Sequence, residues 1–153
     1  MKAFRILTTV VSIGFILVLF GCGKNTPAES TQDKQLKLLS KTWKASTVTL
    51  GGVDQSTTWT NFQLTISGTK TPPFNYSCAS RPTTNGPWPA SGTWTFDDTT
   101  PATVVIRAED NLKITYAVTA TTLQMTFHFT GNGYPGPRVS NIAGDWAFNF
   151  TSN

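Results

Sequence analysis

From residue 42 onward the sequence contains eight short stretches in which large apolar residues alternate with polar ones. These stretches are residues 42–50, 62–66, 74–78, 92–96, 103–107, 112–118, 123–129 and 146–150. Side chains of a β-strand point alternately to its two faces, so each stretch predicts a strand with one buried face. Turn-forming residues fill the short gaps between the middle stretches, which favours antiparallel hairpins between sequence neighbours. We therefore predict an all-β domain.

Eight strands with one apolar face each can bury those faces by closing into an up-and-down antiparallel β-barrel. A two-sheet β-sandwich is the alternative. The side chains expected to point inward are Phe62, Leu64, Ile66, Trp94, Phe96, Ile106, Ile114, Tyr116, Met125, Phe127, Phe148 and Phe150. Because side chains can just fill an eight-stranded interior, such bulky residues argue against a large cavity.

Three longer connections, residues 51–61, 79–91 and 131–143, interrupt the strand pattern. Binding sites of compact β domains usually lie on such loops. Trp59, Trp88 and Tyr134 lie in the first, second and third connection, and they are our candidate contact residues for a small apolar ligand, a glycan or a protein partner. For the two tryptophans the alternative is a ring that folds over the barrel mouth as a plug.

The sequence offers little material for catalysis or metal binding. His128 is the one histidine, and it alternates with the apolar residues of its stretch, so we expect it to point to solvent. Cys78 is in phase with Phe74 and Tyr76, which predicts a buried small apolar side chain rather than a nucleophile. A transition-metal site needs several histidines or cysteines, so we predict no metal, no cofactor and no enzyme activity.

The charged residues also point away from two other functions. The adjacent carboxylates at 97–98 and 109–110 follow strands, where aspartate is favoured for turn hydrogen bonds, so we interpret them as turn residues rather than a glycosidase pair. The formal charge of +4 includes Lys2 and Arg5, and the remaining basic residues are scattered. A nucleic-acid partner is therefore not expected.

The first 35 residues predict export rather than folding. Lys2 and Arg5 precede an apolar run over residues 6–20, which is the outline of a secretion signal. This run is shorter than the roughly 20 residues that span a membrane. Residues 23–35 contain no apolar side chain larger than alanine, which predicts a flexible tether, and the leucine-rich residues 36–41 predict one helical turn.

Residues 19–22, with the sequence LFGC, resemble the lipobox of bacterial lipoproteins. The resemblance implies that residues 1–21 are a lipoprotein signal peptide and that acylated Cys22 anchors the chain in membrane lipid. Residues 22–35 are then the tether. Gly23 after the cysteine resembles an outer-membrane sorting signal, which implies a lipid-anchored location at the outer membrane of the cell envelope, periplasmic or surface-exposed.

Three further segments, LLSKTWK at 38–44, SGTWTF at 91–96 and GDW at 144–146, resemble the lipocalin-like domains of small lipoproteins of Gram-negative bacteria. The resemblance covers residues 36–153. It implies a lipocalin-like barrel without enzyme activity that binds a small apolar ligand, or a partner at the barrel mouth. The alternative is a surface interaction or adhesion module with a filled core and no small-molecule ligand.

Overall fold

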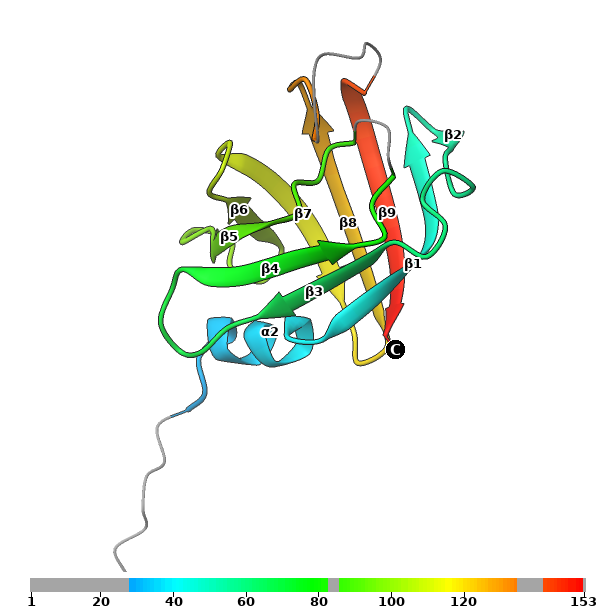
Figure 1. The fold of residues 1–153 in the computed structure, drawn as a ribbon. Coiled ribbons are helices and arrows are strands. Elements are labelled where there is room, and N and C mark those ends of the chain that lie inside the picture. Colours follow the sequence, from blue (N-terminus) through cyan, green and yellow to red (C-terminus); the bar gives the residue numbers. More distant parts are fainter. Residues whose placement is uncertain (1–27, 83–85, 135–141, 153) are drawn as a thin grey trace, which may run out of the picture.

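A computed structural model describes residues 28–82, 86–134 and 142–152, which form a closed antiparallel β-barrel with a helix at one end (Figure 1). The strands are β1 (Thr42–Leu50), β2 (Val53–Asp54), β3 (Gln63–Ser67), β4 (Phe74–Ala79), β5 (Ser91–Phe96), β6 (Val104–Arg107), β7 (Leu112–Val118), β8 (Thr122–Phe129) and β9 (Gly144–Ser152). The ring consists of β1 and β3 to β9, each antiparallel to its neighbours. This confirms the predicted eight-stranded barrel, and the sandwich alternative is wrong.

The first and last strands of the ring close it. β1 pairs with β9 from Trp43 opposite Ser152 to Leu50 opposite Trp146, with one irregularity between Ala45 and Thr47. Closure leaves the ring without an exposed strand edge. The short β2 lies outside the ring and pairs only with the end of β1, so part of the predicted loop 51–61 is a strand that alternation did not reveal.

The inward faces form the core much as the alternation predicts. In β8, Leu123, Met125, Phe127 and Phe129 are buried while the polar residues between them are exposed or half-buried. The buried residues of all eight ring strands form one hydrophobic cluster with residues of α2 (Thr31–Leu39) and of the loops.

One strand has the opposite phase to the predicted one. Ile106 lies half-buried on the outer face of β6, while Val105 and Arg107 point inward. Residues 104–106 are all apolar, so their pattern cannot show which set points inward. The pairing decides it: Arg107 lies opposite the buried Trp94, and directly opposed residues share a face.

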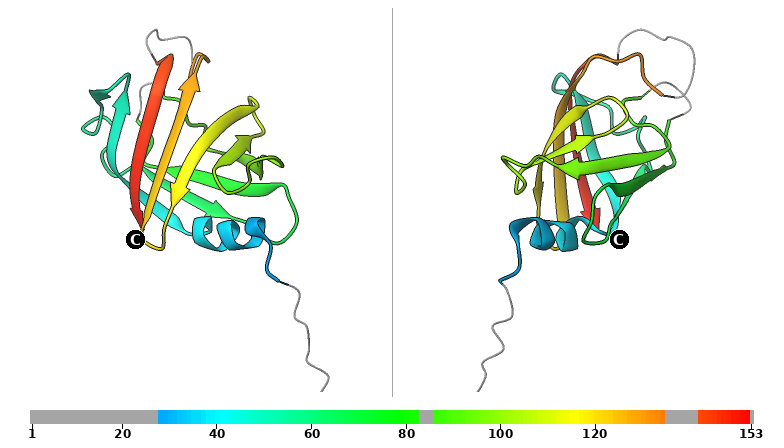
Figure 2. Two further views of the ribbon diagram at one scale, coloured as in Figure 1. Left: turned by 180° about the vertical axis from the view of Figure 1, so that it is seen from behind. Right: turned by 90° about the vertical axis from the view of Figure 1, so that its left-hand side faces the viewer.

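The helix α2 covers one end of the barrel (Figures 1 and 2). The side chain of Ser30 caps its first turn by accepting a hydrogen bond from the backbone nitrogen of Asp33 at 3.0 Å. Leu36 and Leu39 are buried, and the indole nitrogen of Trp43 donates to the carbonyl oxygen of Leu39 at 2.9 Å. None of the described helices is long and apolar enough to cross a bilayer.

The prediction of a flexible tether up to residue 35 is therefore wrong for residues 31–35, which belong to α2. The helical turn predicted at 36–41 is the second half of this helix, which ends at Leu39. The missed signal was local: Ser30, followed three residues later by Asp33, is the spacing of a capped helix start. Residues 1–27, with Cys22, lie outside the described residues.

Phe127→Ala tests the packing of this core. The Phe127 ring stacks on Phe148 with centroids 6.0 Å apart and meets Trp88 edge to face at 5.7 Å. We expect a loss of about 3 to 5 kcal/mol in the free energy of unfolding, because a large cavity would form among rings held by a closed barrel. Urea denaturation measures it. The control Gln124→Ala removes an exposed side chain of the same strand and should cost about 0.5 kcal/mol or less. Equal losses would contradict a tightly packed core.

Candidate functional site at the loop end of the barrel

The end of the barrel opposite α2, here called the loop end, is covered by the connection between β4 and β5 (Figures 1 and 2). Its residues 86–89, the plug segment, are all buried. Gly86 pairs with Tyr134 in an isolated antiparallel bridge, with N–H···O distances of 3.0 and 2.9 Å. The second and third long connections therefore meet at the loop end.

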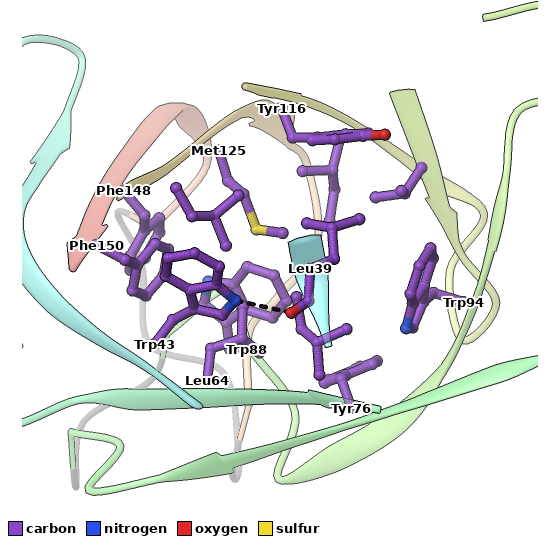
Figure 3. Packing of buried hydrophobic residues seen from close by; sticks show 14 of the residues in the cluster. Leu39, Trp43, Leu64, Tyr76, Trp88, Trp94, Tyr116, Met125, Phe148 and Phe150 are labelled. Carbon is purple, nitrogen blue, oxygen red and sulfur yellow. Dashed lines mark hydrogen bonds between the residues drawn. The ribbon is translucent and has the colours of Figure 1, made fainter. Parts of the chain in front are cut away.

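The Trp88 side chain of the plug segment fills a space between four aromatic rings, and only 2% of Trp88 is exposed. These rings, here called the aromatic box, belong to Phe62, Tyr76, Phe127 and Phe148 at centroid distances of 6.4, 5.8, 5.7 and 6.0 Å from the indole. The last three meet it nearly edge to face, an arrangement that the ring quadrupoles favour. Figure 3 shows Trp88 packed among core side chains such as Tyr76 and Phe148.

Arg107 forms the polar wall of this box. It is 1% exposed, and its Nε and Nη2 donate to the two carboxylate oxygens of Asp110 at 2.9 and 2.5 Å. Its Nη1 donates to the carbonyl oxygen of Pro87 at 2.7 Å, and the guanidinium lies 5.2 Å from the Trp88 ring centroid. A buried charge costs several kcal/mol unless it is paired, so the two-bond contact with Asp110 is what makes this position possible.

A second arginine holds the next carbonyl of the plug segment. Arg81 donates from Nη1 to the carbonyl oxygen of Trp88 at 3.1 Å. The indole nitrogen of Trp88, in contrast, is buried and has no hydrogen-bond partner within the described ranges. An unpaired buried donor of this kind costs about 1 to 3 kcal/mol. Hydrogen bonds to its backbone thus anchor the plug segment, while the indole nitrogen of its Trp88 side chain has no described partner.

Glu109 links two strands of the same end. Its carboxylate accepts from the Tyr76 hydroxyl at 3.0 Å and from the backbone nitrogen of Thr93 at 2.7 Å. Burial raises the pKa of Tyr76 well above its ordinary value. The carboxylates at 109–110 do lie between two strands, as predicted, but each also has a structural partner that the turn interpretation did not include.

Arg107 is the functional candidate that sequence reasoning missed. The sequence holds one hint of a partner for it, because Asp110 follows three residues later. This hint was not decisive, because arginine at the end of a strand is usually solvated. The structure places it inside the barrel.

The interior holds a cavity of about 20 Å³. Leu39 bounds it from the helix end, and Trp88 and Arg107 bound it from the loop end. Small-molecule pockets usually measure roughly 300 to 1,000 Å³. A ligand of that size does not fit while Trp88 occupies the aromatic box.

The three candidate contact residues gather at the loop end, but the two tryptophans are not surface residues. Trp59 is 2% exposed and meets Phe62 and Phe148 edge to face, each at 4.9 Å. Both rings are therefore buried at the loop end, as the alternative of a ring folded over the barrel mouth describes. That Trp59 and Trp88 contact a ligand or partner stays a prediction. Tyr134 is half-buried, with its ring 6.0 Å from the Arg107 guanidinium.

The remaining polar candidates are an exposed histidine and a buried turn aspartate. His128 points outward, as predicted, and its Nδ1 lies 2.6 Å from Asp145 Oδ1. Asp97 accepts hydrogen bonds from the backbone nitrogens of Thr99 and Thr100, which confirms its turn role. Within the residues that the structure describes, no three His, Cys, Asp or Glu side chains are grouped so that they could hold a metal ion.

No protein-family model, no curated protein and no solved structure matches this chain.

The reactivity of the Cys78 thiol tests how β4 packs against the core. It faces inward in β4, and burial raises its pKa from 9.0 to about 12. The thiolate is therefore rare in the native protein at pH 8, and iodoacetamide should alkylate the native chain much more slowly than the urea-unfolded chain. Mass spectrometry of timed samples measures both rates.

The same raised pKa predicts how stability changes in alkaline solution. Below pH 9, the pKa of the unfolded thiol, the contribution of Cys78 is fully present, and it is lost as pH rises toward 12. The pKa values of Tyr76 and Tyr116 are also raised by burial, which acts in the same direction. Urea titrations should show a falling free energy of unfolding above pH 9, with a smaller fall in Cys78→Ala. Equal alkylation rates of the native and the unfolded chain would show that the half-buried Cys78 thiol is not shielded by the fold.

Proposed function

We propose that this protein is an exported, lipid-anchored, non-enzymatic binding protein of the cell envelope, and that its barrel takes a small ligand with an apolar body at the loop end. One observation carries the binding proposal: the aromatic box is filled by Trp88, a residue of a loop rather than of a strand. A strand residue cannot leave the core without breaking the hydrogen-bonded ladder. A loop residue can leave when few backbone contacts open.

The plug segment has few described backbone hydrogen bonds. They are the two of the bridge to Tyr134, one from Arg107 and one from Arg81, and the remaining described contacts are those of the Trp88 ring with the aromatic box and Arg107. When the segment moves outward, the space of an indole ring joins the existing cavity of about 20 Å³. The result is a concave, aromatic-lined pocket with few polar groups, the usual composition of a small-molecule site.

The anchor proposal rests on the lipobox-like residues that end at Cys22 and on the position of α2. Eight residues, 23–30, separate Cys22 from the helix start, and a fully extended chain of that length reaches at most about 30 Å. Because α2 lies opposite the plug segment, a lipid at Cys22 would leave the loop end facing away from the membrane (Figure 1). The acyl chains that the resemblance implies would hold the domain more firmly than a single myristoyl chain does.

A filled barrel that acts as a surface interaction module remains the second candidate, and the small volume of the internal cavity favours it. Its contact surface would not be the buried tryptophans. The outer face of β1, β7, β8 and β9 carries a shallow groove of about 460 Å³, lined by polar side chains such as Thr49, Thr126 and Asp145. A glycan or protein partner would bind there without any change in the core.

Cys22→Ala tests the anchor. The variant should lose its lipid and appear as uncut or soluble chain, because no thiol remains at residue 22 for acylation. Fractionation and intact-mass measurement of the exported protein distinguish the outcomes. Cys78→Ala is the matched control and should keep the mass increment of the lipid and the membrane association. A Cys22→Ala chain that stays with membranes at an unchanged processed mass would refute the anchor.

Native mass spectrometry tests the ligand. The chain from residue 28 onward keeps α2 and every described strand, and after purification from its host it should carry one small apolar molecule per barrel. Unfolding in urea releases the ligand, and 2-naphthoate added to the refolded chain should restore a one-to-one complex. A chain that carries no adduct and binds no aromatic probe would reject ligand binding in favour of the interaction module.

A further inference from the structure

Two cationic side chains hold successive carbonyl oxygens of the plug segment. Arg107 donates to Pro87 at 2.7 Å, and Arg81 donates to Trp88 at 3.1 Å. If the plug segment leaves, both guanidinium groups lose an acceptor. Arg107 is 1% exposed, so little water can take the place of the lost carbonyl acceptor. A ligand that enters here must therefore bring acceptor oxygens of its own.

The donors of Arg107 are only partly used. A guanidinium carries five N–H groups in a fixed plane. Asp110 accepts from Nε and Nη2, and Pro87 accepts from Nη1, which leaves two N–H groups without an acceptor among the described residues. Once Pro87 has moved, both terminal nitrogens have free N–H groups. This is the pattern that a carboxylate satisfies with two parallel hydrogen bonds.

The charge around Arg107 is compatible with a further anion. Asp110 keeps 26% of its side chain exposed, so water screens much of its repulsion of a second carboxylate. Glu109 is already engaged by the Tyr76 hydroxyl and the Thr93 backbone nitrogen. Arg81, released from Trp88, supplies a second positive charge at the same end.

The aromatic box sets the size of the ligand body. It now encloses an indole, edge to face with three of its rings, and the adjoining cavity adds only about 20 Å³. A bicyclic aromatic group fits this space, whereas a long acyl chain does not. The indole nitrogen of Trp88 has no partner there, so a ring without an N–H group would occupy the box at lower free-energy cost.

We propose that the ligand is a compact aromatic carboxylate: its ring replaces Trp88 in the aromatic box, and its carboxylate binds Arg107 in place of the Pro87 carbonyl. This inference rests on the proposed function and adds to it the chemical class of the ligand. Trp88 is then an internal competitor that keeps the box closed until ligand arrives.

The test compares two probes of nearly equal shape, 2-naphthoate and 2-naphthamide, by calorimetric titration of the full mature chain in detergent. The wild type should bind the carboxylate at least tenfold tighter, the size expected of charge-assisted hydrogen bonds. Arg107→Met should remove this preference. Lys113→Met is the matched control, because Lys113 pairs with Asp97 outside the barrel, and it should keep the preference. Trp88→Ala should bind 2-naphthoate about tenfold tighter than the wild type.

Amide exchange reports where the probe binds. The N–H groups of Gly86 and Tyr134 bond to each other's carbonyls, so both should exchange faster when 2-naphthoate displaces the plug segment. Protection unchanged at saturating probe would overturn the replacement of Trp88.

Different results would overturn the carboxylate class of the ligand and ligand binding as such. Equal affinities of the wild type for carboxylate and amide, or a preference that survives in Arg107→Met, would overturn the carboxylate class and leave ligand binding intact. If Arg107→Met does not fold, the wild-type comparison and the exchange rates decide the question. No binding of either probe to the wild type or to Trp88→Ala, with no ligand in native mass spectrometry, would reject the proposed function itself.

Discussion

The pairing of β1 with β9 is the constraint on which the rest of this structure depends. It turns a meander of hairpins into a ring, and a ring of eight strands encloses a fixed volume that side chains can just fill. Every inward residue then competes for the same space. The ring contacts of Phe148, tilted with Phe62, stacked with Phe127 and edge to face with Trp59, are the result of that competition. A cavity of about 20 Å³ is what remains.

The two ends of the ring are closed in chemically different ways. At the helix end Leu39 is fully buried and its carbonyl oxygen accepts a hydrogen bond from the Trp43 indole, while the neighbouring Ser40 hydroxyl is buried without a partner among the described residues. At the loop end the plug segment contacts a buried charge, and the Trp88 indole nitrogen lacks a partner. Each end thus holds one buried polar atom without a partner in the described part of the chain, Ser40 Oγ at the helix end and the Trp88 indole nitrogen at the loop end. The loop end differs because the segment that closes it belongs to a loop and contacts a buried charge, and the proposed opening lies there for that reason.

Sequence reasoning succeeded where one face of a strand is apolar and the other polar, as in β7 and β8, because a register shift of one residue would expose the whole buried set. It failed where that contrast is missing: residues 104–106 are apolar on both faces, so the inward position of Arg107 was not visible. It also failed at residues 31–35, where packing against the end of the barrel stabilises a short capped helix. The burial of Trp59 and Trp88 depends on the volume that the closed ring leaves, which no local pattern records.

The chemistry of position 107 separates the two functional candidates. A barrel that only needs a filled core gains nothing from a buried ion pair, since replacement of such pairs by apolar residues of similar volume is often neutral or stabilising. An aliphatic residue at 107 would pack against the Trp88 ring and would need no acceptor, although the Pro87 carbonyl would lose this donor. The guanidinium instead orients Asp110 and a plug carbonyl with one rigid fork. A group of this kind is matched to a planar acceptor, and the loop end offers the space for one when Trp88 moves.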